Sequence, residues 1–257
     1  MSWFAAEIDG PVVLTRGIHF AAAAAAAGVL MFRSLVAEPA LRPSAEGNAV
    51  VEARLLRLTW AALAVVILTG VVWLTLETMS MASLAWDEAM RSGAMQTVVN
   101  ETQFGLVFEV RAGLSILLAA CLTLNRFALA RWVALAAGLA LVTAIALTGH
   151  AGATLGELGD LHLAADVLHL AAASAWIGGL AGLCVLFAVG RHRPAREWGP
   201  LQFDAIRRFS IIGMISVAVL IASGIVHVCG SWSARSGRCL RPITAGFSCS
   251  SSLPLRS

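Results

Sequence analysis

The chain contains neither lysine nor tyrosine, and charged residues of any kind are scarce. Only 13% of its 257 residues are charged, and the basic residues, 18 in number, are all arginine. Hydrophobic residues make up 59% of the chain, and its mean hydropathy is +0.82. A water-soluble core cannot accommodate so much apolar sequence, so a polytopic membrane protein is indicated. The formal net charge of +3 is small, and we expect no nucleic-acid partner.

Several motifs of soluble enzymes and metal proteins are also missing. The five cysteines include no CxxC pair, which argues against a zinc ribbon or a thioredoxin-like site. The sequence has no P-loop, no GxGxxG and no GxSxG motif. We therefore expect no enzyme, and any transport would use gradients or transfer between proteins. Met1–Thr15 lacks a basic n-region and contains Glu7 and Asp9, so no cleavable signal peptide is expected.

Six apolar segments have the length that a membrane-spanning helix needs, about 20 residues. They are Val12–Val36, Leu55–Leu76, Gly105–Leu124, Phe127–Leu147, Leu161–Val189 and Ser210–Val228. The sequence therefore predicts an all-α fold, a polytopic transmembrane helix bundle with six spanning helices in the lipid bilayer.

The segments between these helices alternate in charge. Residues 37–54, 125–131 and 190–209 carry half of the 18 arginines, whereas 77–104 and 148–160 are acidic. Basic connections stay in the cytoplasm according to the positive-inside rule. We therefore expect a periplasmic N-terminus and periplasmic acidic connections.

This topology places several polar groups on the outer side. Five of the six histidines fall there: His19, His150, His162, His169 and His227. On a helix, His162, Asp166 and His169 share one face because of their i, i+4, i+7 spacing. Ionisable groups inside a membrane are costly and are therefore candidates for function. Since imidazole is a good copper ligand, we predict His19, His150, His162 and His169 as metal ligands.

Each of these residues also has a structural interpretation. A single histidine in a membrane helix is more often a hydrogen-bond partner of a neighbouring helix than a ligand. Asp166 could bind the metal directly. Its i, i+3 spacing to His169 favours a different role, as the acceptor that fixes a histidine tautomer or as a proton partner.

The acidic outer segment contains a second set of candidate ligands. Four of the seven methionines lie there, namely Met79, Met81, Met90 and Met95. Thioethers are soft ligands that select Cu(I), so we predict that these methionines contact copper. Alternatively, they fill gaps between amphipathic helices of this segment.

Two charged residues and three residues expected to pack against a neighbouring helix complete the list of candidate residues. Glu109 and Arg111 lie within an apolar segment, so each should be paired or face a polar cavity. They are candidates for proton partners, with a structural ion pair in which Asp166 or Glu109 is the partner as the alternative. Gly178 and Gly179, close to Trp176, predict that a neighbouring helix packs closely there.

The order of these motifs resembles that of the copper resistance protein D (CopD) family. Asp166-x-x-His169 followed by Trp176 and Gly178-Gly179 resembles the signature helix of that family. The other similar motifs are Arg16-x-x-His19, Thr102-Gln-Phe-Gly105 through Arg111, Gly149-His150-Ala151 and Arg208-Phe209-Ser210.

The resemblance implies a multi-pass protein of the bacterial inner membrane with about eight helices. It also implies a role in copper uptake or resistance, often beside a periplasmic copper carrier, CopC. We therefore expect copper, as Cu(I) or Cu(II), to be accepted at the periplasmic face through the His/Asp/Met cluster. A membrane cytochrome is the alternative, with His19 and His169 as axial haem ligands.

The character of the sequence changes after Val228. Residues 229–257 show no helical apolar period, although the resemblance leads us to expect two further helices. We predict that residues 1–228 form a CopD-like transmembrane domain and that residues 229–257 form a non-native, disordered tail. We attribute this tail to a truncation or a shift of reading frame, which the nucleotide sequence would reveal.

Overall fold

The computed structural model describes residues 9–148 and 157–236, and all regular structure in these ranges is helical. The long helices are α1 (Asp9–Phe32), α3 (Ala45–Ala82), α6 (Gln103–Thr123), α7 (Ala128–Thr143), α8 (Glu157–Gly190) and α9 (Ala195–Ser236). The short ones are η1 (Arg33–Ala37), α2 (Glu38–Leu41), α4 (Trp86–Arg91), α5 (Ala94–Glu101) and η2 (Ala146–Thr148). The predicted all-α helix bundle is thereby confirmed.

Five helical stretches of the described ranges are long and apolar enough to cross a membrane. They are Gly10–Leu41, Glu46–Ala82, Gln103–Thr123, Gly159–Gly190 and Ala195–Val228. The other predicted span forms the 16-residue helix α7, followed by the 3-10 turn η2. At about 1.5 Å per residue, α7 alone is shorter than the ~30 Å hydrocarbon core. All six predicted segments are therefore helical, and one of them is short.

The helices extend beyond the apolar segments from which they were predicted. At the start of α3 the Ser44 hydroxyl accepts a hydrogen bond from the Gly47 amide, which caps the helix. Its C-terminal end is set by Ser83, whose φ of 55° is left-handed. Apolar character marks only the part of a helix that faces hydrocarbon, so the caps lie further out. Helix α9 likewise continues past Val228 to Ser236, while residues 237–257 lie outside the described part.

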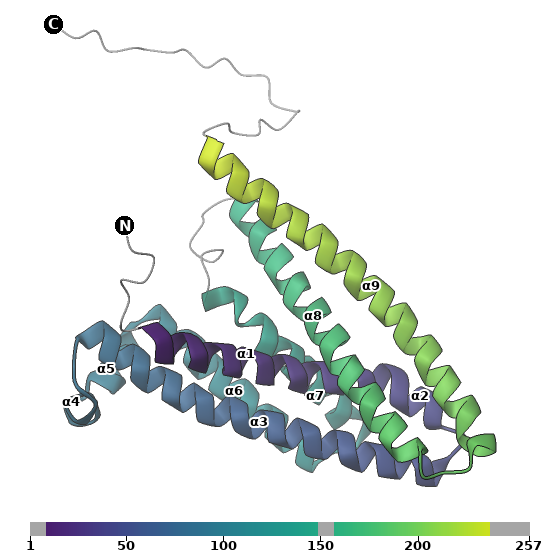
Figure 1. Ribbon diagram of the computed structural model, residues 1–257. Helices are drawn as coiled ribbons and strands as arrows, with labels where there is room; N and C mark the ends of the chain where they lie inside the picture. The colour runs from purple at the N-terminus through teal and green to yellow at the C-terminus, as the bar shows by residue number, and fades with distance from the viewer. Residues whose placement is uncertain (1–8, 149–156, 237–257) are drawn as a thin grey trace, which may run out of the picture.

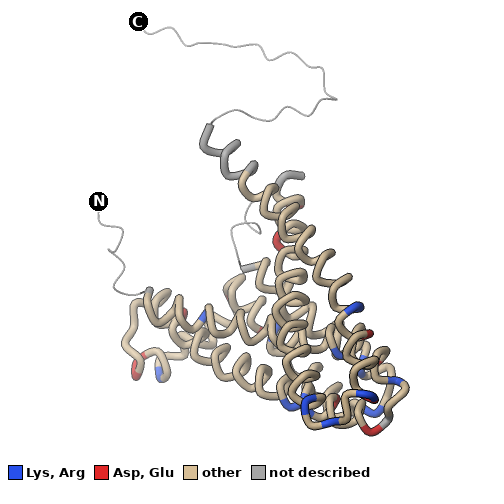
Figure 2. The backbone as a smooth tube through the Cα atoms, turned by 45° about the vertical axis from the view of Figure 1, so that its right-hand side comes forward, with Lys and Arg blue, Asp and Glu red and all other residues tan. Residues whose placement is uncertain are grey.

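Helix α1 is the centre of the arrangement, because it packs against α3, α7 and α8. Helices α8 and α9 form an antiparallel hairpin that leaves the other long helices at an angle (Figure 1). Most arginines gather at the end of the molecule where α2 and the α8–α9 connection lie (Figure 2). This clustering agrees with the predicted assignment of the basic connections to one side of the membrane.

The crossing of α1 and α8 depends on glycines. A Cβ atom placed on Gly28 would overlap the backbone of Ser174 and Gly178, and one on Gly178 would overlap Gly28. Gly179 is in the same way covered by the ring of Phe209 on α9. Helix backbones approach this closely only where side chains are absent, so the two helices are in backbone contact.

A buried ion network joins the basic end of the bundle. The Arg33 side chain, 3% exposed, donates to Glu52 Oε1 at 2.7 Å, and its Nε lies 3.3 Å from Glu38 Oε1. Asn125 Nδ2 donates to the same Glu52 oxygen at 2.8 Å, and Arg131 Nη1 lies 3.5 Å from Glu38. Three segments that are distant in sequence are thereby tied together.

The first span is distorted next to this network. Residues Arg33–Ala37 form a π-helical turn, in which the Glu38 amide donates to the Arg33 carbonyl. Pro39 follows Glu38 in the sequence. In a regular α-helix a proline at this position has no amide hydrogen to donate to the Leu35 carbonyl, and its ring clashes with that carbonyl. A single widened turn accommodates the proline without ending the span.

The glycine contact gives a first prediction. Gly28→Ala should destabilise the protein by about 1–3 kcal/mol, because the added methyl group forces α1 and α8 apart. Gly113→Ala on α6 is the matched control, since a Cβ there meets nothing within 4 Å. Unfolding of the purified variants in SDS would measure both changes. Equal stability of the two variants would contradict the proposed backbone contact.

The ion network gives a second prediction. Glu52→Ala should destabilise by about 2–3 kcal/mol, because the buried Arg33 loses its shortest partner. The effect should be smaller than that of a fully buried pair, since the Glu52 side chain is 22% exposed. Asp87→Ala, which breaks the exposed Arg91 pair at 3.3 Å, should cost less than ~1 kcal/mol. The same unfolding measurement compares them, and a larger loss for Asp87→Ala would refute the structural role of the network.

Candidate functional site

The predicted histidine ligands that the structure describes lie in two separate clusters. His19 lies between α1, α3 and α6, where it contacts Thr69 and Arg111. His162 and His169 lie on α8 beside His227 of α9. His150 lies outside the described residues. The described histidines therefore do not form one common cluster.

The α8–α9 cluster is built around His227. Its Nε2 lies 3.0 Å from Asp166 Oδ1, so the carboxylate accepts the Nε2 proton. The His162 ring stacks on it with centroids 6.2 Å apart and planes at 18°, and the His169 ring stands edge-on at 6.3 Å. Helical spacing on α8 brings its three residues to one face, as predicted, and α9 supplies the fourth.

Hydrogen bonds fix the tautomers in this cluster. The Ser223 hydroxyl donates to the Val219 carbonyl at 2.7 Å, so its oxygen accepts the bond from His169 Nδ1 at 2.9 Å. This arrangement leaves the lone pair of His169 on Nε2. By the same argument, the bond to Asp166 leaves the lone pair of His227 on Nδ1.

Asp166 pairs across the helix interface. Its i, i+3 spacing favoured His169 as its partner, but the structure pairs it with His227 instead. His169 is held by Ser223, also on α9, so both α8 side chains point toward that helix. The Ser223-x-x-x-His227 spacing, which puts both residues on one face of α9, was the sequence signal that could have identified them.

The cluster does not form a closed metal site. Across the described ranges, no three His, Cys, Asp or Glu side chains are spaced to hold a metal ion. Imidazole nitrogens bind a metal at about 2.0–2.1 Å, so the rings of this cluster would have to rotate until their nitrogens face a common point before they share an ion. The Asp166 and His227 side chains are 33% and 36% exposed, which leaves room for such rotation.

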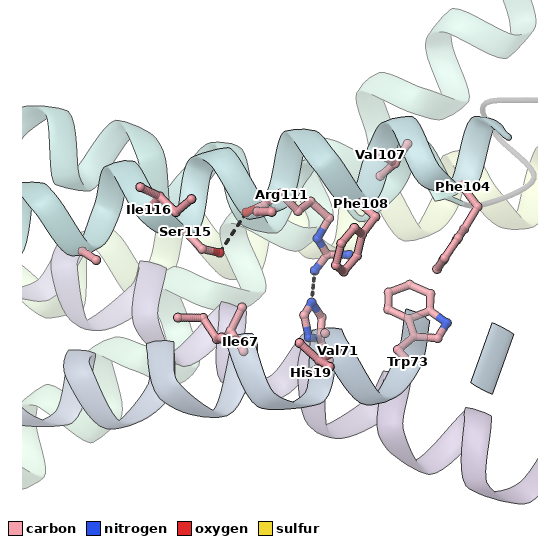
Figure 3. A pocket seen from close by; sticks show the side chains of 14 residues that line it. His19, Ile67, Val71, Trp73, Phe104, Val107, Phe108, Arg111, Ser115 and Ile116 are labelled. Carbon is pink, nitrogen blue, oxygen red and sulfur yellow. Dashed lines mark hydrogen bonds between the residues drawn. The ribbon is translucent and has the colours of Figure 1, made fainter. Parts of the chain in front are cut away.

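Both ring nitrogens of His19, in contrast, are engaged within the protein, and Figure 3 shows its contact with Arg111. Its Nδ1 donates to Thr69 Oγ1 at 2.9 Å, and that hydroxyl donates to the Val65 carbonyl at 2.6 Å. Arg111 Nη2 donates to His19 Nε2. Both ring nitrogens are therefore occupied, and His19 could bind a metal only if Arg111 moved away.

Glu109 and Arg111 face different sides of α6. Arg111 is 5% exposed and points inward to His19, whereas Glu109 is exposed. Residues two positions apart do not face one another on a helix, so the alternative of a Glu109–Arg111 ion pair is not observed. Asp166, the other suggested partner of Arg111, pairs with His227.

The remaining predicted residues lie on other surfaces. Met79 and Met81 belong to the last turns of α3, Met90 to α4 and Met95 to α5. Met81 and Met90 are each 54% exposed. Trp176, 41% exposed, lies on the outside of the α8–α9 hairpin near Gly213. The acidic outer segment that contains these methionines is thus largely helical, which agrees with the alternative of amphipathic helices.

Comparison with known proteins identifies relatives for the first part of the chain. The model of the copper resistance protein D-like, N-terminal domain family matches residues 7–160. "Copper transport protein CutJ" of Bacillus subtilis (strain 168) is 31% identical over 160 residues, which cover 60% of this chain and 29% of that protein. "Copper resistance protein D" of Pseudomonas syringae pv. tomato is 28% identical over 145 residues, 55% of this chain and 46% of that protein.

The chain thus spans less than half of the length of either relative. No solved structure matches it. The family match includes His19, Arg111 and the methionine segment, whereas Asp166 and His169 lie beyond its end. Because the match extends over more than half of the sequence, the chain belongs to the copper resistance protein D-like family.

Proposed function

We propose that the protein takes part in copper transport or copper resistance and accepts copper at the outer ends of α8 and α9. The observation that carries this proposal is the meeting of three imidazoles and one carboxylate, with His227 in contact with Asp166 at 3.0 Å. The names of the two relatives, a copper transport protein and a copper resistance protein, support copper as the substrate.

The hydrogen bonds of the cluster suit this role. Asp166 orients His227 so that its free lone pair is on Nδ1, and Ser223 orients His169 so that its free lone pair is on Nε2. A carboxylate behind an imidazole ligand raises its basicity and holds its tautomer. Rotation of His162, which stacks on His227, would add a third imidazole. Imidazole sets of this kind suit copper more than magnesium or calcium.

Copper would reach this cluster from the periplasm. The exposed Met81 and Met90, with Met79 and Met95, are suited to collect Cu(I) beside the outer end of α3. A periplasmic CopC-like carrier would deliver the ion, and the protein would act as a binding and transport protein rather than an enzyme. This order requires the N-terminus and the 77–101 segment to lie on the periplasmic side of the inner membrane.

The cytochrome alternative receives less support. His19 and His169 belong to different clusters, and His19 is held by Arg111 and Thr69. Among the described residues that line the cavity beside His19, it is the only imidazole. Facing axial ligands for haem are therefore not present at that position.

Substitutions in the cluster test the copper proposal. Asp166→Asn, His169→Ala and His227→Ala should each weaken copper binding by about 10–100-fold, because each removes a ligand or its orienting acceptor. His192→Ala is the matched control, since His192 is an exposed histidine in the α8–α9 connection. Competition with a chromogenic Cu(I) chelator on the purified protein measures the affinity.

Cellular copper accumulation provides the second measurement, with membrane insertion checked for each variant. Wild-type affinity and accumulation in all three variants would show that the cluster does not accept copper. An optical spectrum of the purified protein distinguishes the cytochrome alternative from the copper proposal, because a Soret band would favour haem.

Labelling at the two ends of α3 tests the orientation. In a cysteine-free background, Ser83→Cys should react with a membrane-impermeant maleimide added to the periplasmic side. Ser44→Cys, at the opposite end of the same helix, should react only after the membrane is opened. The reverse pattern would invert the topology and remove the methionines from the path of periplasmic copper.

A further inference from the structure

Arg111 is a buried cation whose hydrogen-bonding capacity is only partly used. Its side chain is 5% exposed, and Nη2 donates to His19. Nε and Nη1 have no hydrogen-bond partner within the described residues, and no carboxylate there forms an ion pair with the guanidinium. An uncompensated charge inside a membrane protein is expensive, so this arrangement points to a missing anionic acceptor.

The guanidinium lines a cavity of about 340 Å³ between α1, α3 and α6 (Figure 3). Its walls are almost entirely apolar, including Phe104, Phe108 and Trp73. The Ser115 hydroxyl is already used, since it donates to the Arg111 carbonyl at 2.8 Å. Arg111 therefore supplies the free polar atoms of an otherwise apolar chamber.

The cavity opens toward lipid. Ile67, Val71 and Ile116 line it and are 47%, 56% and 71% exposed, so its rim lies on the outer surface of α3 and α6. Arg111 is eight residues beyond Gln103, the first residue of α6. That spacing corresponds to about 12 Å along the helix axis. A small ion from water would not reach this depth, but an amphipathic molecule from the bilayer would.

A second cation adds to the positive charge here. The guanidinium carbon of Arg16 lies 5.3 Å from the Trp73 ring centroid, and that of Arg111 lies 5.7 Å from it. Both also lie 5.9 Å from the Phe20 ring. The neighbouring carboxylate of Glu77 accepts from Trp73 Nε1 at 3.1 Å and forms no ion pair with either arginine. The outer end of the cavity therefore favours an anion.

We propose that this cavity binds a lipophilic carboxylate of the fatty-acid class. The carboxylate accepts hydrogen bonds from Arg111 and neutralises its charge, and the hydrocarbon chain occupies the apolar chamber and leaves between α3 and α6. A neutral carbonyl compound such as a quinone would satisfy the donors but leave the charge uncompensated. The inference is independent of the copper proposal, because it involves none of the α8–α9 residues.

Fluorescence quenching by a brominated fatty acid tests this site, because Trp73 lines the cavity. Dibromostearate should quench the full-length protein in nanodiscs saturably, and Trp73→Phe should remove the saturable part. The methyl ester of the same acid, which lacks the charge, should bind at least about tenfold more weakly. Arg111→Gln should weaken binding of the acid by a similar factor.

Two further variants make the outcome decisive. Ala112→Phe fills the cavity while it keeps Arg111, so it should also abolish saturable quenching even if Arg111→Gln fails to fold. Arg126→Gln is the matched control, because Arg126 lies over the Phe127 ring at 4.7 Å beyond the other end of α6. Binding unchanged by Ala112→Phe would overturn the proposal. Equal binding of the ester, or of a quinone analogue used as competitor, would overturn the assignment of a carboxylate.

Discussion

A charge that lies among packed membrane helices is costly unless it is paired, and this constraint fixes the helix contacts at two places in the structure. At the basic end, Arg33 is enclosed by Glu38 and Glu52, and the resulting network joins the first span to α3 and to the α6–α7 turn. At the other end of the α8–α9 hairpin, Asp166 is paired with His227. Removal of one partner would leave the other unpaired and poorly solvated, which is energetically costly. Each pair therefore also fixes the relative position of its helices.

Close packing of α1 determines which polar groups can meet. The backbone contact at Gly28 and Gly178 places α8 against the C-terminal half of α1, and α9 follows α8 as a hairpin. His19, nearer the start of α1, faces α3 and α6 instead. One helix crossing therefore divides the histidines between two clusters. The topology predicted from the sequence had placed them at a similar depth in the membrane.

Sequence patterns predicted the helices better than they predicted the site. Apolar runs of about 20 residues are a direct consequence of bilayer thickness, so the segments could be located without tertiary information. The shared face of His162, Asp166 and His169 also followed from helical spacing. The pairing of Asp166 with His227, and of Arg111 with His19, could not be predicted, because it depends on how helices distant in sequence cross. The short helices of the methionine segment were expected only in the alternative interpretation, because its polar residues hide the apolar period.

Hydrogen bonding, more than residue type, separates His169 and His227, which keep a free ring lone pair, from His19, which does not. At α8–α9, carboxylate and hydroxyl oxygens accept the ring protons of His227 and His169, so each ring keeps a free lone pair. At His19, a guanidinium donates to the lone pair that a metal would need. An imidazole held by an acceptor is prepared for a cation, whereas one held by a cationic donor stabilises that cation instead. The same residue type therefore keeps a free lone pair in one cluster and anchors a buried arginine in the other.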